Sequence, residues 1–465
     1  MTIMTRKRLS RLAQQLPGRV SLPGDERYAA VTAIWAKPVG PLPRVVVHCR
    51  TAEDVQLAIR AARDAFLPLS VRGGGHDWAG RALCDGLVID LSGMNAVAIE
   101  ADNRLARIAG GARAANVAAA ADGRGLAAVT GSVGAVGMAG LTLGGGYGPL
   151  VGRCGLALDN LIAAEVVLAD GRVVLADYDH EPDLFWALRG GGGNFGVVTA
   201  MRHRLHKIPS VRSGMLIYPF SQARAVLEGC IDIAASAPHE LTFQVGLVAG
   251  ADATPVLMVV PTWCGAPGEG EGRLAPFLKL GTLIVGSVNE MALSTALTIF
   301  DPYLVDGQRI FMETCSLPAL DSAGIDIFIR AMQTAVSPGC AIFTHEFKGV
   351  AARVPVEATA FGLRREHVLV EILTVCADSS DPADERRHRQ WARATLARFD
   401  AMALPGGYPN LLAAHDVERA AQSYGDNAER LVKAKRHYDP DNVFRSAIPL
   451  PVDQAVRQDF LQSAE

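Results

Sequence analysis

A histidine follows three consecutive glycines early in the chain, in the sequence Arg72-Gly-Gly-Gly-His76. Glycines carry no Cβ atom, so a loop of this kind exposes consecutive backbone N–H groups, an arrangement that binds pyrophosphate. A neutral imidazole nitrogen is also a competent nucleophile. The loop therefore has the residue types for anion binding and covalent chemistry, although one triple glycine alone is equally typical of a surface turn.

Two more glycine-rich loops lie in the first half of the chain, Gly140-Leu-Thr-Leu-Gly-Gly-Gly-Tyr-Gly148 and Gly190-Gly-Gly-Gly193. Repetition at this density indicates backbone that is closely approached by a large ligand. None of the loops fits the Rossmann fingerprint, G-x-G-x-x-G opening a helix after a strand, with an acidic residue at the usual distance. We predict a phosphate-bearing cofactor held by a fold other than Rossmann.

Local patterns predict the elements that position these loops. Residues 51–66 are expected to form a helix, because Thr51 and Asp54 can make a capping box and apolar residues recur on one face. Asp170-Gly171 separates two β-branched runs and predicts a hairpin. Further strands are predicted at 69–72, 86–91, 244–248, 256–260 and 367–375, and further helices at 112–121, 181–188 and 426–436.

Composition sets the class of protein. The chain has 465 residues, of which 49% are hydrophobic and 20% charged, so we expect a globular protein with two domains. A net charge of −3 provides no general attraction to nucleic acid or to an anionic membrane. No apolar run reaches the roughly 18 residues of a transmembrane helix. The basic residues Arg6 to Arg11 are expected to belong to a short exposed amphipathic helix.

The eight cysteines are scattered, with no CxxC pair and no spacing that would chelate a metal. Reduced thiols in a cytoplasmic protein are the expected state, and most of these side chains are expected to be small buried apolar groups. No metal site is predicted.

The segment Val71-Arg-Gly-Gly-Gly-His-Asp77 resembles the pyrophosphate loop of the berberine-bridge-enzyme-like oxidases, in the vanillyl-alcohol-oxidase and p-cresol-methylhydroxylase (PCMH) flavoprotein superfamily. Other segments follow in the family's order, among them Val136-Gly-Met-Ala-Gly140, Gly155-Leu-Ala-Leu-Asp-Asn160 and Tyr438-Asp-Pro-Asp-Asn442. The phrases Leu126-Ala-Ala-Val-Thr-Gly131 and Phe185-Trp-Ala-Leu-Arg189 look most like the 6-hydroxynicotine oxidases and related bacterial tailoring oxidases.

The resemblance implies FAD bonded covalently from a ring nitrogen of His76 to the 8α-methyl carbon of the flavin. Many relatives add a second bond from a cysteine, but that position is Val133 here, so a single linkage is expected. The cofactor-binding residues implied by the matching motifs are Arg72, Gly73, Gly74, Gly75, His76, Asp77, Gly80, Thr130, Gly131, Val136, Gly137, Gly140, Gly145, Tyr147, Gly148, Asp159, Asn160, Gly196, Val197, Val198 and Asn442.

Catalytic side chains are expected on a strand of the substrate domain, where the relatives present charged residues at alternate positions. In Ile342-Phe-Thr-His-Glu-Phe-Lys-Gly349 this places Thr344, Glu346 and Lys348 on one face, with His345 pointing the other way. Glu346 is the first candidate for a base or substrate anchor, and Lys348 is expected to keep its pKa low. A solvated edge strand explains the same pattern.

Two tyrosines are further catalytic candidates. Relatives that oxidise carbohydrates carry Tyr-x-Asn-Tyr with the last tyrosine as base, whereas this chain has Tyr408-Pro-Asn410-Leu411, so the phenol is absent at that place. Tyr147, in the second glycine loop, is the expected substitute, although a tyrosine there can also simply pack against the cofactor.

The resemblance implies an α+β fold of two domains. The expected division is a PCMH-type FAD-binding domain at residues 1–212, with its core at about 40–208, a substrate-binding domain at 213–424 with an antiparallel sheet covered by helices, and a segment at 425–465 that returns to the first domain.

The expected function is an oxidase of a small alcohol or amine, with transfer of hydride to flavin N5, dioxygen as acceptor and hydrogen peroxide as product. The open alternatives are a cyclase or tailoring enzyme with little net redox turnover and a dehydrogenase that reacts poorly with oxygen. Neither the substrate nor the oligomeric state is assigned by the sequence.

Overall fold

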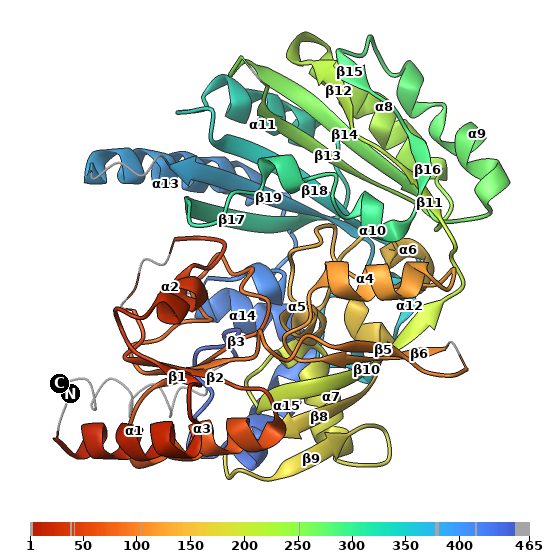
Figure 1. Cartoon of the computed structure of the whole chain (residues 1–465). Coiled ribbons are helices and arrows are strands. Elements are labelled where there is room, and N and C mark those ends of the chain that lie inside the picture. The colour runs from red at the N-terminus through yellow and green to blue at the C-terminus, as the bar shows by residue number, and fades with distance from the viewer. Residues whose placement is uncertain are drawn as a thin grey trace.

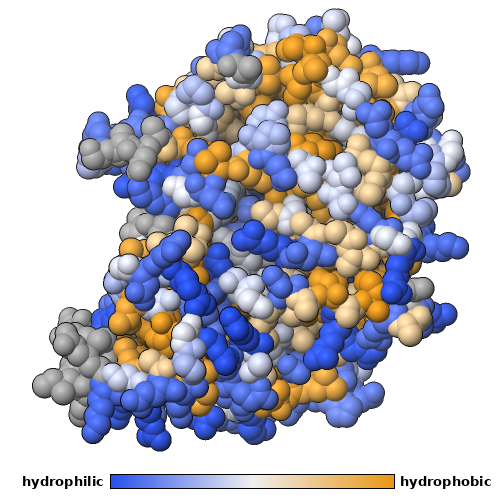
Figure 2. Space-filling view, in the orientation of Figure 1, coloured by the Kyte–Doolittle hydropathy of each residue, from blue (hydrophilic) through white to orange (hydrophobic). Residues whose placement is uncertain are grey.

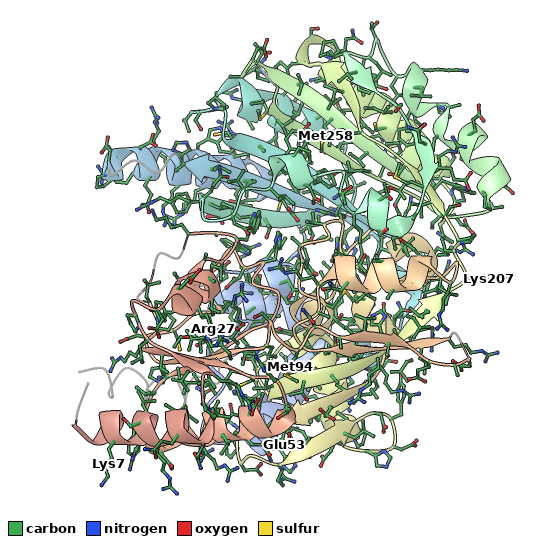
Figure 3. All side chains as sticks on the ribbon, viewed as in Figure 1. Lys7, Arg27, Glu53, Met94, Lys207 and Met258 are labelled. Atoms are coloured by element: carbon green, nitrogen blue, oxygen red, sulfur yellow. The ribbon has the colours of Figure 1, made fainter. Side chains whose placement is uncertain are left out.

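The computed structural model describes residues 3–37, 40, 42–102, 104–250, 252–376, 381–413 and 416–451. These residues form a lower part that contains two sheets and an upper part built on one large sheet (Figure 1). The chain passes upward after β10, near Lys207, which Figure 3 labels at the edge of the molecule.

The first sheet positions the histidine loop. Its order is β1-β2-β4-β3, in which β2, β4 and β3 are parallel and β1 is antiparallel. The crossover from β2 to β3 passes through α3, whose N-cap Thr51 forms the predicted capping box with Asp54. The bounds are β1 (Val20–Ser21), β2 (Val45–His48), α3 (Ala52–Asp64), β3 (Leu69–Arg72) and β4 (Leu87–Asp90).

The second sheet is antiparallel, with the order β5-β6-β10-β8-β9, and β7 pairs with β10. The predicted hairpin across Asp170-Gly171 joins β8 to β9. The bounds are β5 (Val97–Ile99), β6 (Leu105–Ala109), β7 (Ala127–Ala128), β8 (Leu161–Val167), β9 (Val173–Ala176) and β10 (Val197–His206).

The upper sheet is also antiparallel and has nine strands, with the main order β15-β12-β14-β13-β18-β19-β17. Edge strands β11 and β16 pair with each other, and β11 also pairs with β14. The bounds are β11 (Val211–Ser213), β12 (Leu216–Pro219), β13 (Leu241–Ala249), β14 (Pro255–Trp263), β15 (Val285–Gly286), β16 (Asn289–Met291), β17 (Arg309–Leu317), β18 (Cys340–Phe347) and β19 (His367–Cys376).

Helices cover one face of the upper sheet. Apolar residues of α8 (Ala223–Ser236), α11 (Ser322–Gln333) and α13 (Pro382–Leu396) share a buried cluster with every second residue of the sheet. Met258 of β14 is buried within this part (Figure 3). The other sheet face, over β17 to β19, is thereby left to face the lower part.

The C-terminal helix α15 (Ala428–Tyr438) packs against α7 (Pro182–Gly191) in the lower part, although the chain reaches it only after the whole upper sheet. Lys435 donates to the carbonyls of Asn194 and Phe444, which ties the last described segment to the third glycine loop. The remaining helices are α1 (Ile3–Gln15), α2 (Glu26–Thr32), α4 (Ala114–Asp122), α5 (Met138–Gly144), α6 (Val151–Cys154), α9 (Gly270–Leu274), α10 (Leu293–Ala296), α12 (Val350–Arg353) and α14 (Val417–Tyr424).

The N-terminal helix differs from its prediction as a short exposed helix. Leu9, Leu12 and Leu16 are buried in one cluster with α3 and the first sheet. Three apolar residues on one helical face are stabilised by packing against the protein, since burial removes their surface from water. Its polar face remains outside, as exposed Lys7 shows at the lower edge of the molecule (Figure 3).

The surface in the view of Figure 2 is mostly mixed, with hydrophobic colour gathered near the top over the β12–β15 edge, where Ile284 and Val285 are exposed. Within the described part of the chain, none of the helices is both long and apolar enough to cross a membrane.

Candidate active site

A cavity of about 480 Å³ lies between the lower and upper parts, and two walls enclose most of it. The glycine wall is formed by lower-part residues Gly73, Gly74, Gly75, His76, Asp77, Val133, Val136, Gly137, Gly140, Tyr147, Gly192, Gly193, Gly196, Val197 and Val198. The sheet wall is formed by Gln244, Ile310, Met312, Phe343, His345, Leu369, Glu371, Leu373 and Val375.

The histidine loop gives the glycine wall its hydrogen-bond donors. Strand β3 ends at Arg72, which pairs with buried Asp90, and the chain then turns past Gly74. A Cβ on Gly74 would lie 2.4 Å from Cα of Gly137, so this approach needs glycine. We find no acceptor among the described residues for the backbone N–H groups of residues 73–77. Unpaired consecutive N–H groups at a cavity wall suit a pyrophosphate, so these residues fit the predicted cofactor.

Several positions in the other two glycine runs lie against protein segments, while others line the cavity. A Cβ on Gly145 would lie 2.5 Å from the Tyr408 ring, and one on Gly144 would lie 2.2 Å from the Asn410 side chain. A Cβ on Gly190 would meet the backbone of Phe361 at 2.3 Å. Much of the glycine density therefore lets distant protein segments approach one another, and only part of it opens backbone to a ligand.

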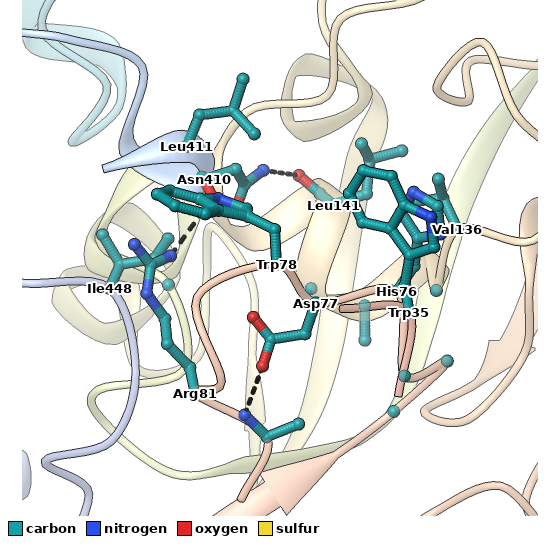
Figure 4. Close-up of a pocket in the computed structure, with 18 of the residues that line it drawn as sticks. Trp35, His76, Asp77, Trp78, Arg81, Val136, Leu141, Asn410, Leu411 and Ile448 are labelled. Carbon is teal, nitrogen blue, oxygen red and sulfur yellow. Dashed lines mark hydrogen bonds between the residues drawn. The ribbon is translucent and has the colours of Figure 1, made fainter. Parts of the chain in front are cut away.

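His76 stands in the wall with its ring stacked on Trp35 at a centroid distance of 4.2 Å (Figure 4). Burial lowers the pKa of His76 to about 4, so the imidazole is neutral near pH 7. On the other side of Asp77, Figure 4 shows Trp78, Arg81, Asn410, Leu411 and Ile448, which bring the C-terminal segment to the same cavity.

Tyr147 and Tyr408 meet edge to face at 4.6 Å. Nδ1 of His367 lies 2.7 Å from the Arg365 carbonyl and carries the hydrogen, so Nε2 accepts from the Tyr147 hydroxyl at 2.6 Å. The Tyr408 hydroxyl accepts from Gly146 N–H and from the Asn410 amide, which leaves its own hydrogen to donate. Burial raises the pKa of Tyr147 well above its usual value and that of Tyr408 to about 12, so both phenols are protonated at neutral pH.

The sheet wall is apolar except for one row of polar side chains across β13, β18 and β19. The Gln244 amide lies 2.7 Å from Nδ1 of His345, and Nε2 of His345 lies 3.1 Å from Oε1 of Glu371. The Gln244 amide donates to the His345 ring, and that ring lies against the Glu371 carboxylate. Glu371 thereby lines the same cavity as His76, Tyr147 and Tyr408.

Glu346 and Lys348 lie elsewhere than predicted. Strand β18 turns Phe343 and His345 toward the large cavity, so Glu346 faces an adjoining cavity of about 30 Å³. The Glu346 carboxylate accepts from Phe243 N–H, and the Thr344 hydroxyl accepts from Val245 N–H. These side chains take over backbone donors of β13 beyond the point where its ladder with β18 ends at Gly246.

The pKa of Glu346 also differs from the expectation. Burial raises it, and this effect exceeds the lowering by Lys348, whose Nζ lies 3.3 Å from Oε1.

The prediction of one shared face for Thr344, Glu346 and Lys348 concerned spacing alone. The identity of the face turned to the cavity depends on the twist and packing of the whole sheet, and here it is the opposite one.

The predicted cofactor residues fall into two groups. Those that line the large cavity are Gly73, Gly74, Gly75, His76, Asp77, Val136, Gly137, Gly140, Tyr147, Gly196, Val197 and Val198. Those that do not line it are Arg72, Gly80, Thr130, Gly131, Gly145, Gly148, Asp159, Asn160 and Asn442.

Several of the second group have protein partners instead. The Asp159 carboxylate pairs with Arg364 at 2.7 Å, and the Asn160 amide donates to the carbonyls of Cys154 and Leu156. Asn442 adopts a left-handed conformation with φ of 49° after α15, and Phe444 lines the cavity in its place. These motif residues hold the loops that border the cavity.

One other cluster has metal-ligand residue types. Ligand atoms of Cys376, Asp384 and His388 lie within 4.8 Å of one another. Both His388 nitrogens are already engaged, Nδ1 with the Asp384 carbonyl and Nε2 with Ser337. Hydrogen bonding accounts for this arrangement. All eight cysteines are free, and none of them lines the large cavity.

Sequence reasoning missed Glu371, Gln244 and Trp35. Glu371 carried a usable signal, because it is the sole acidic residue in the mostly apolar strand β19. Alternation along a strand places it on the face opposite that of its buried neighbours Val370 and Ile372. Trp35 and Gln244 had no local signal, since their roles depend on contacts with residues far away in the chain.

Comparison with known proteins agrees with this cavity. Residues 43–177 match the FAD binding domain family, and residues 399–451 match the berberine and berberine-like family. FAD-linked oxidoreductase OXR1 of Pyricularia oryzae is 31% identical over 456 residues, which covers 93% of this chain and 89% of the relative.

Solved structures have the same fold. The crystal structure of 6-hydroxy-D-nicotine oxidase from Arthrobacter nicotinovorans matches with a TM-score of 0.83 at 28% identity, covering 94% of this chain and 98% of that one. Glucooligosaccharide oxidase from Acremonium strictum, with a 6-S-cysteinyl, 8α-N1-histidyl FAD, matches with a TM-score of 0.82 at 25% identity, covering 97% and 99%. With its α+β fold, its open donors and these relatives, the chain belongs to the FAD-linked oxidoreductases with berberine-like C-terminal segments.

Proposed function

We propose that this FAD-dependent oxidoreductase is an oxidase that holds its cofactor through one covalent bond at His76. Its substrate is a small alcohol or amine, and dioxygen is the final acceptor, giving hydrogen peroxide. When bound, FAD accepts a hydride from the substrate carbon and passes the electrons on to oxygen. The protein supplies binding, orientation and proton transfer.

The glycine wall supports the cofactor assignment. The open N–H groups of residues 73–77 would hold the pyrophosphate, and His76 is neutral and therefore nucleophilic at one ring nitrogen. Val133 lies in the wall where relatives place a second linking cysteine. A valine has no nucleophile, so the proposed linkage is single, unlike the doubly linked FAD named for the glucooligosaccharide oxidase.

The observation that carries the catalytic proposal is the Glu371 carboxylate, which lies in the apolar sheet wall beside His345, with 17% of its side chain exposed. We assign Glu371 the role of accepting the proton of the substrate hydroxyl or amine, with His345 and Gln244 as positioning residues. Nε2 of His345 lies 3.1 Å from Oε1, and Oε2 is the oxygen that we assign to the substrate. Tyr408 is proposed to donate a hydrogen bond in the same space, and Tyr147 to hold the aromatic cluster through His367.

The character of the sheet wall favours a compact, partly apolar substrate. Six of its members are Ile310, Met312, Phe343, Leu369, Leu373 and Val375, which offer no hydrogen bonds to a row of sugar hydroxyls. Leu411 lines the cavity at the place where the carbohydrate-oxidising relatives have a tyrosine, and this difference also favours a substrate other than a sugar. A molecule of the size and polarity of 6-hydroxynicotine suits this wall better than an oligosaccharide.

The domain division is part of the proposal. Residues 1–212 and 425–465 would form one cofactor domain, with 213–424 inserted as the substrate domain. Packing of α15 on α7 and the bonds of Lys435 to Asn194 and Phe444 support a C-terminal segment that belongs with the cofactor domain. The cytoplasm remains the predicted location, a prediction made from the unpaired cysteines.

One experiment tests the function. The purified enzyme is mixed without oxygen with a panel of cyclic amines, aromatic alcohols and sugars, and the flavin absorbance is followed. We expect an amine or aromatic alcohol to bleach the flavin, and air to restore it with one hydrogen peroxide per turnover. Product formation without bleaching would indicate the cyclase alternative, and slow recovery in air would indicate a dehydrogenase.

The linkage has its own measurement. Protein denatured in acid should stay yellow, and a proteolytic peptide containing His76 should carry the mass of the flavin. A colourless pellet with free FAD in the supernatant contradicts the covalent bond.

A further inference from the structure

The His76 ring is held by stacking. Its plane lies at 10° to the Trp35 ring with centroids 4.2 Å apart, and neither imidazole nitrogen has a hydrogen-bond partner among the residues that the structure describes. Figure 4 shows the two rings together beside Val136, away from the polar group at Asp77. The ring orientation therefore depends on an aromatic contact, and both nitrogens stay available.

Trp35 is itself fixed by backbone bonds on both sides of the cavity. Its N–H donates to the Gly75 carbonyl at 3.0 Å, and its carbonyl accepts from Gly307 N–H at 2.9 Å. The next residue, Ala36, forms an isolated parallel bridge with Gln308. The backbone that carries the indole is thus clamped between the histidine loop of the lower part and the segment that leads into β17 of the upper part.

We propose that Trp35 is a positioning residue for covalent attachment of the flavin, because its indole face holds the His76 imidazole in one plane with a nitrogen free to react. This inference rests on the proposed linkage at His76. A residue that fixes a nucleophile in a reactive orientation acts on the rate of bond formation, and less on binding of the free cofactor.

The attachment step balances as follows. A bond forms between an imidazole nitrogen and the 8α-methyl carbon of FAD, while that carbon and the imidazole each lose one hydrogen as a proton. The electron pair of the broken C–H bond reduces the flavin ring. Dioxygen then takes two electrons and two protons and leaves as hydrogen peroxide.

The clamp adds a structural condition to this step. Since Trp35 is bonded to Gly307 as well as to Gly75, and its neighbour to Gln308, the backbone that carries the indole is fully fixed when the upper part is seated on the lower part. Attachment should therefore follow assembly of the cavity. Free FAD can occupy the glycine wall earlier, because the open N–H groups of residues 73–77 belong to the lower part alone.

The test measures the covalent fraction of flavin, independently of turnover. Trp35→Ala, Trp35→Leu and Trp35→Phe are purified, total FAD is read from absorbance, and bound flavin is read from fluorescence in denaturing gels during incubation with added FAD in air. We expect Trp35→Ala and Trp35→Leu to retain FAD but to attach it about 10- to 100-fold more slowly. Trp35→Phe should stay near the wild-type rate, since a phenyl ring keeps a face for stacking.

The Trp35→Leu variant distinguishes ring stacking on His76 from simple filling of the space beside it. Attachment at the wild-type rate in Trp35→Leu would overturn the proposal, because an apolar side chain without a ring face would then suffice, and wild-type attachment in Trp35→Ala would do the same. His76→Ala is the reference without a nucleophile. A covalent flavin in His76→Ala would instead refute the proposed linkage itself, so failure of the two proposals can be told apart.

Discussion

The two walls of the cavity use different parts of the chain for chemistry. In the glycine wall the groups that matter are backbone N–H donors at residues 73–77, exposed because glycines remove Cβ atoms. In the sheet wall the backbones of β18 and β19 are paired with each other in the ladder, and side chains such as Glu371 and His345 reach the cavity. Backbone donors do not depend on side-chain identity, so the cofactor site tolerates sequence change outside its glycines. The chemistry of a side-chain site, by contrast, changes with single substitutions.

The largest expected effect comes from removing the proposed proton acceptor of the sheet wall, Glu371. Glu371→Gln keeps the volume and removes the charge, so reduction of the flavin by substrate should slow by about two to four orders of magnitude. Stopped-flow absorbance without oxygen measures it. The matched control is Glu346→Gln on the other face of β18, which should reduce at a near-normal rate. The opposite ranking of the two variants would return the base to Glu346.

The second test asks whether Asp159 belongs to the glycine wall or only supports it. Arg364 is fully buried against Asp159, so Asp159→Asn leaves a buried cation without its partner charge. We expect a loss of about 3–5 kcal/mol in the free energy of unfolding, measured by urea titration. Loss of FAD with unchanged stability would show that the carboxylate contacts the cofactor, as its motif implied.

A methyl group on the second glycine loop should cost somewhat less. Gly145 has φ of 147° and its Cβ would lie 2.5 Å from the Tyr408 ring, so Gly145→Ala should destabilise the protein by about 3 kcal/mol through strain and overpacking. Gly123 ends α4 with φ of −59° and no atom within 4 Å of a Cβ, so Gly123→Ala should be neutral or stabilise by up to about 1 kcal/mol. Thermal unfolding compares them, and equal effects would contradict the packing explanation.

The smallest expected effect concerns pH. Burial lowers the pKa of His203 from 6.5 to about 4, so its contribution is present above pH 6.5 and is lost as pH falls toward 4. At pH 5 the loss is about 2 kcal/mol for this one residue. Urea titrations at pH 7 and pH 5 should show a smaller difference for His203→Gln than for the wild type. An unchanged difference would mean that other groups dominate the acid limb.

The contrast between the walls also explains what the sequence could predict. Three features depend mainly on neighbouring residues and can therefore be predicted from local residue types: the histidine loop, the capping box at Thr51 and the hairpin at Asp170-Gly171. The face of β18 that meets the cavity depends on the register of a nine-stranded sheet, and period-two spacing does not select between the two faces.

Distance in the chain limited the other predictions. Asp159 and Asn160 were assigned to the cofactor because their motif was recognised, but their partners, Arg364 and His206, come from elsewhere in the chain. Trp35 meets His76 through a clamp that includes Gly307, which no local pattern indicates. The glycine runs were predicted to be approached by a large ligand, and the approach of Tyr408, Asn410 and Phe361 to some of these glycines required the fold.

The position of the C-terminal segment in the cavity wall has a consequence for biosynthesis. Phe444 and Ile448 line the cavity beside residues of the first sheet, and the Cβ of Gly192 would collide with Ile448. A ribosome makes the histidine loop early and these residues near the end, and domains generally fold as they emerge. The nascent lower part therefore has an incomplete wall until residues 444–448 are made, and the proposed covalent attachment of flavin would be completed only on chains whose translation has passed residue 448.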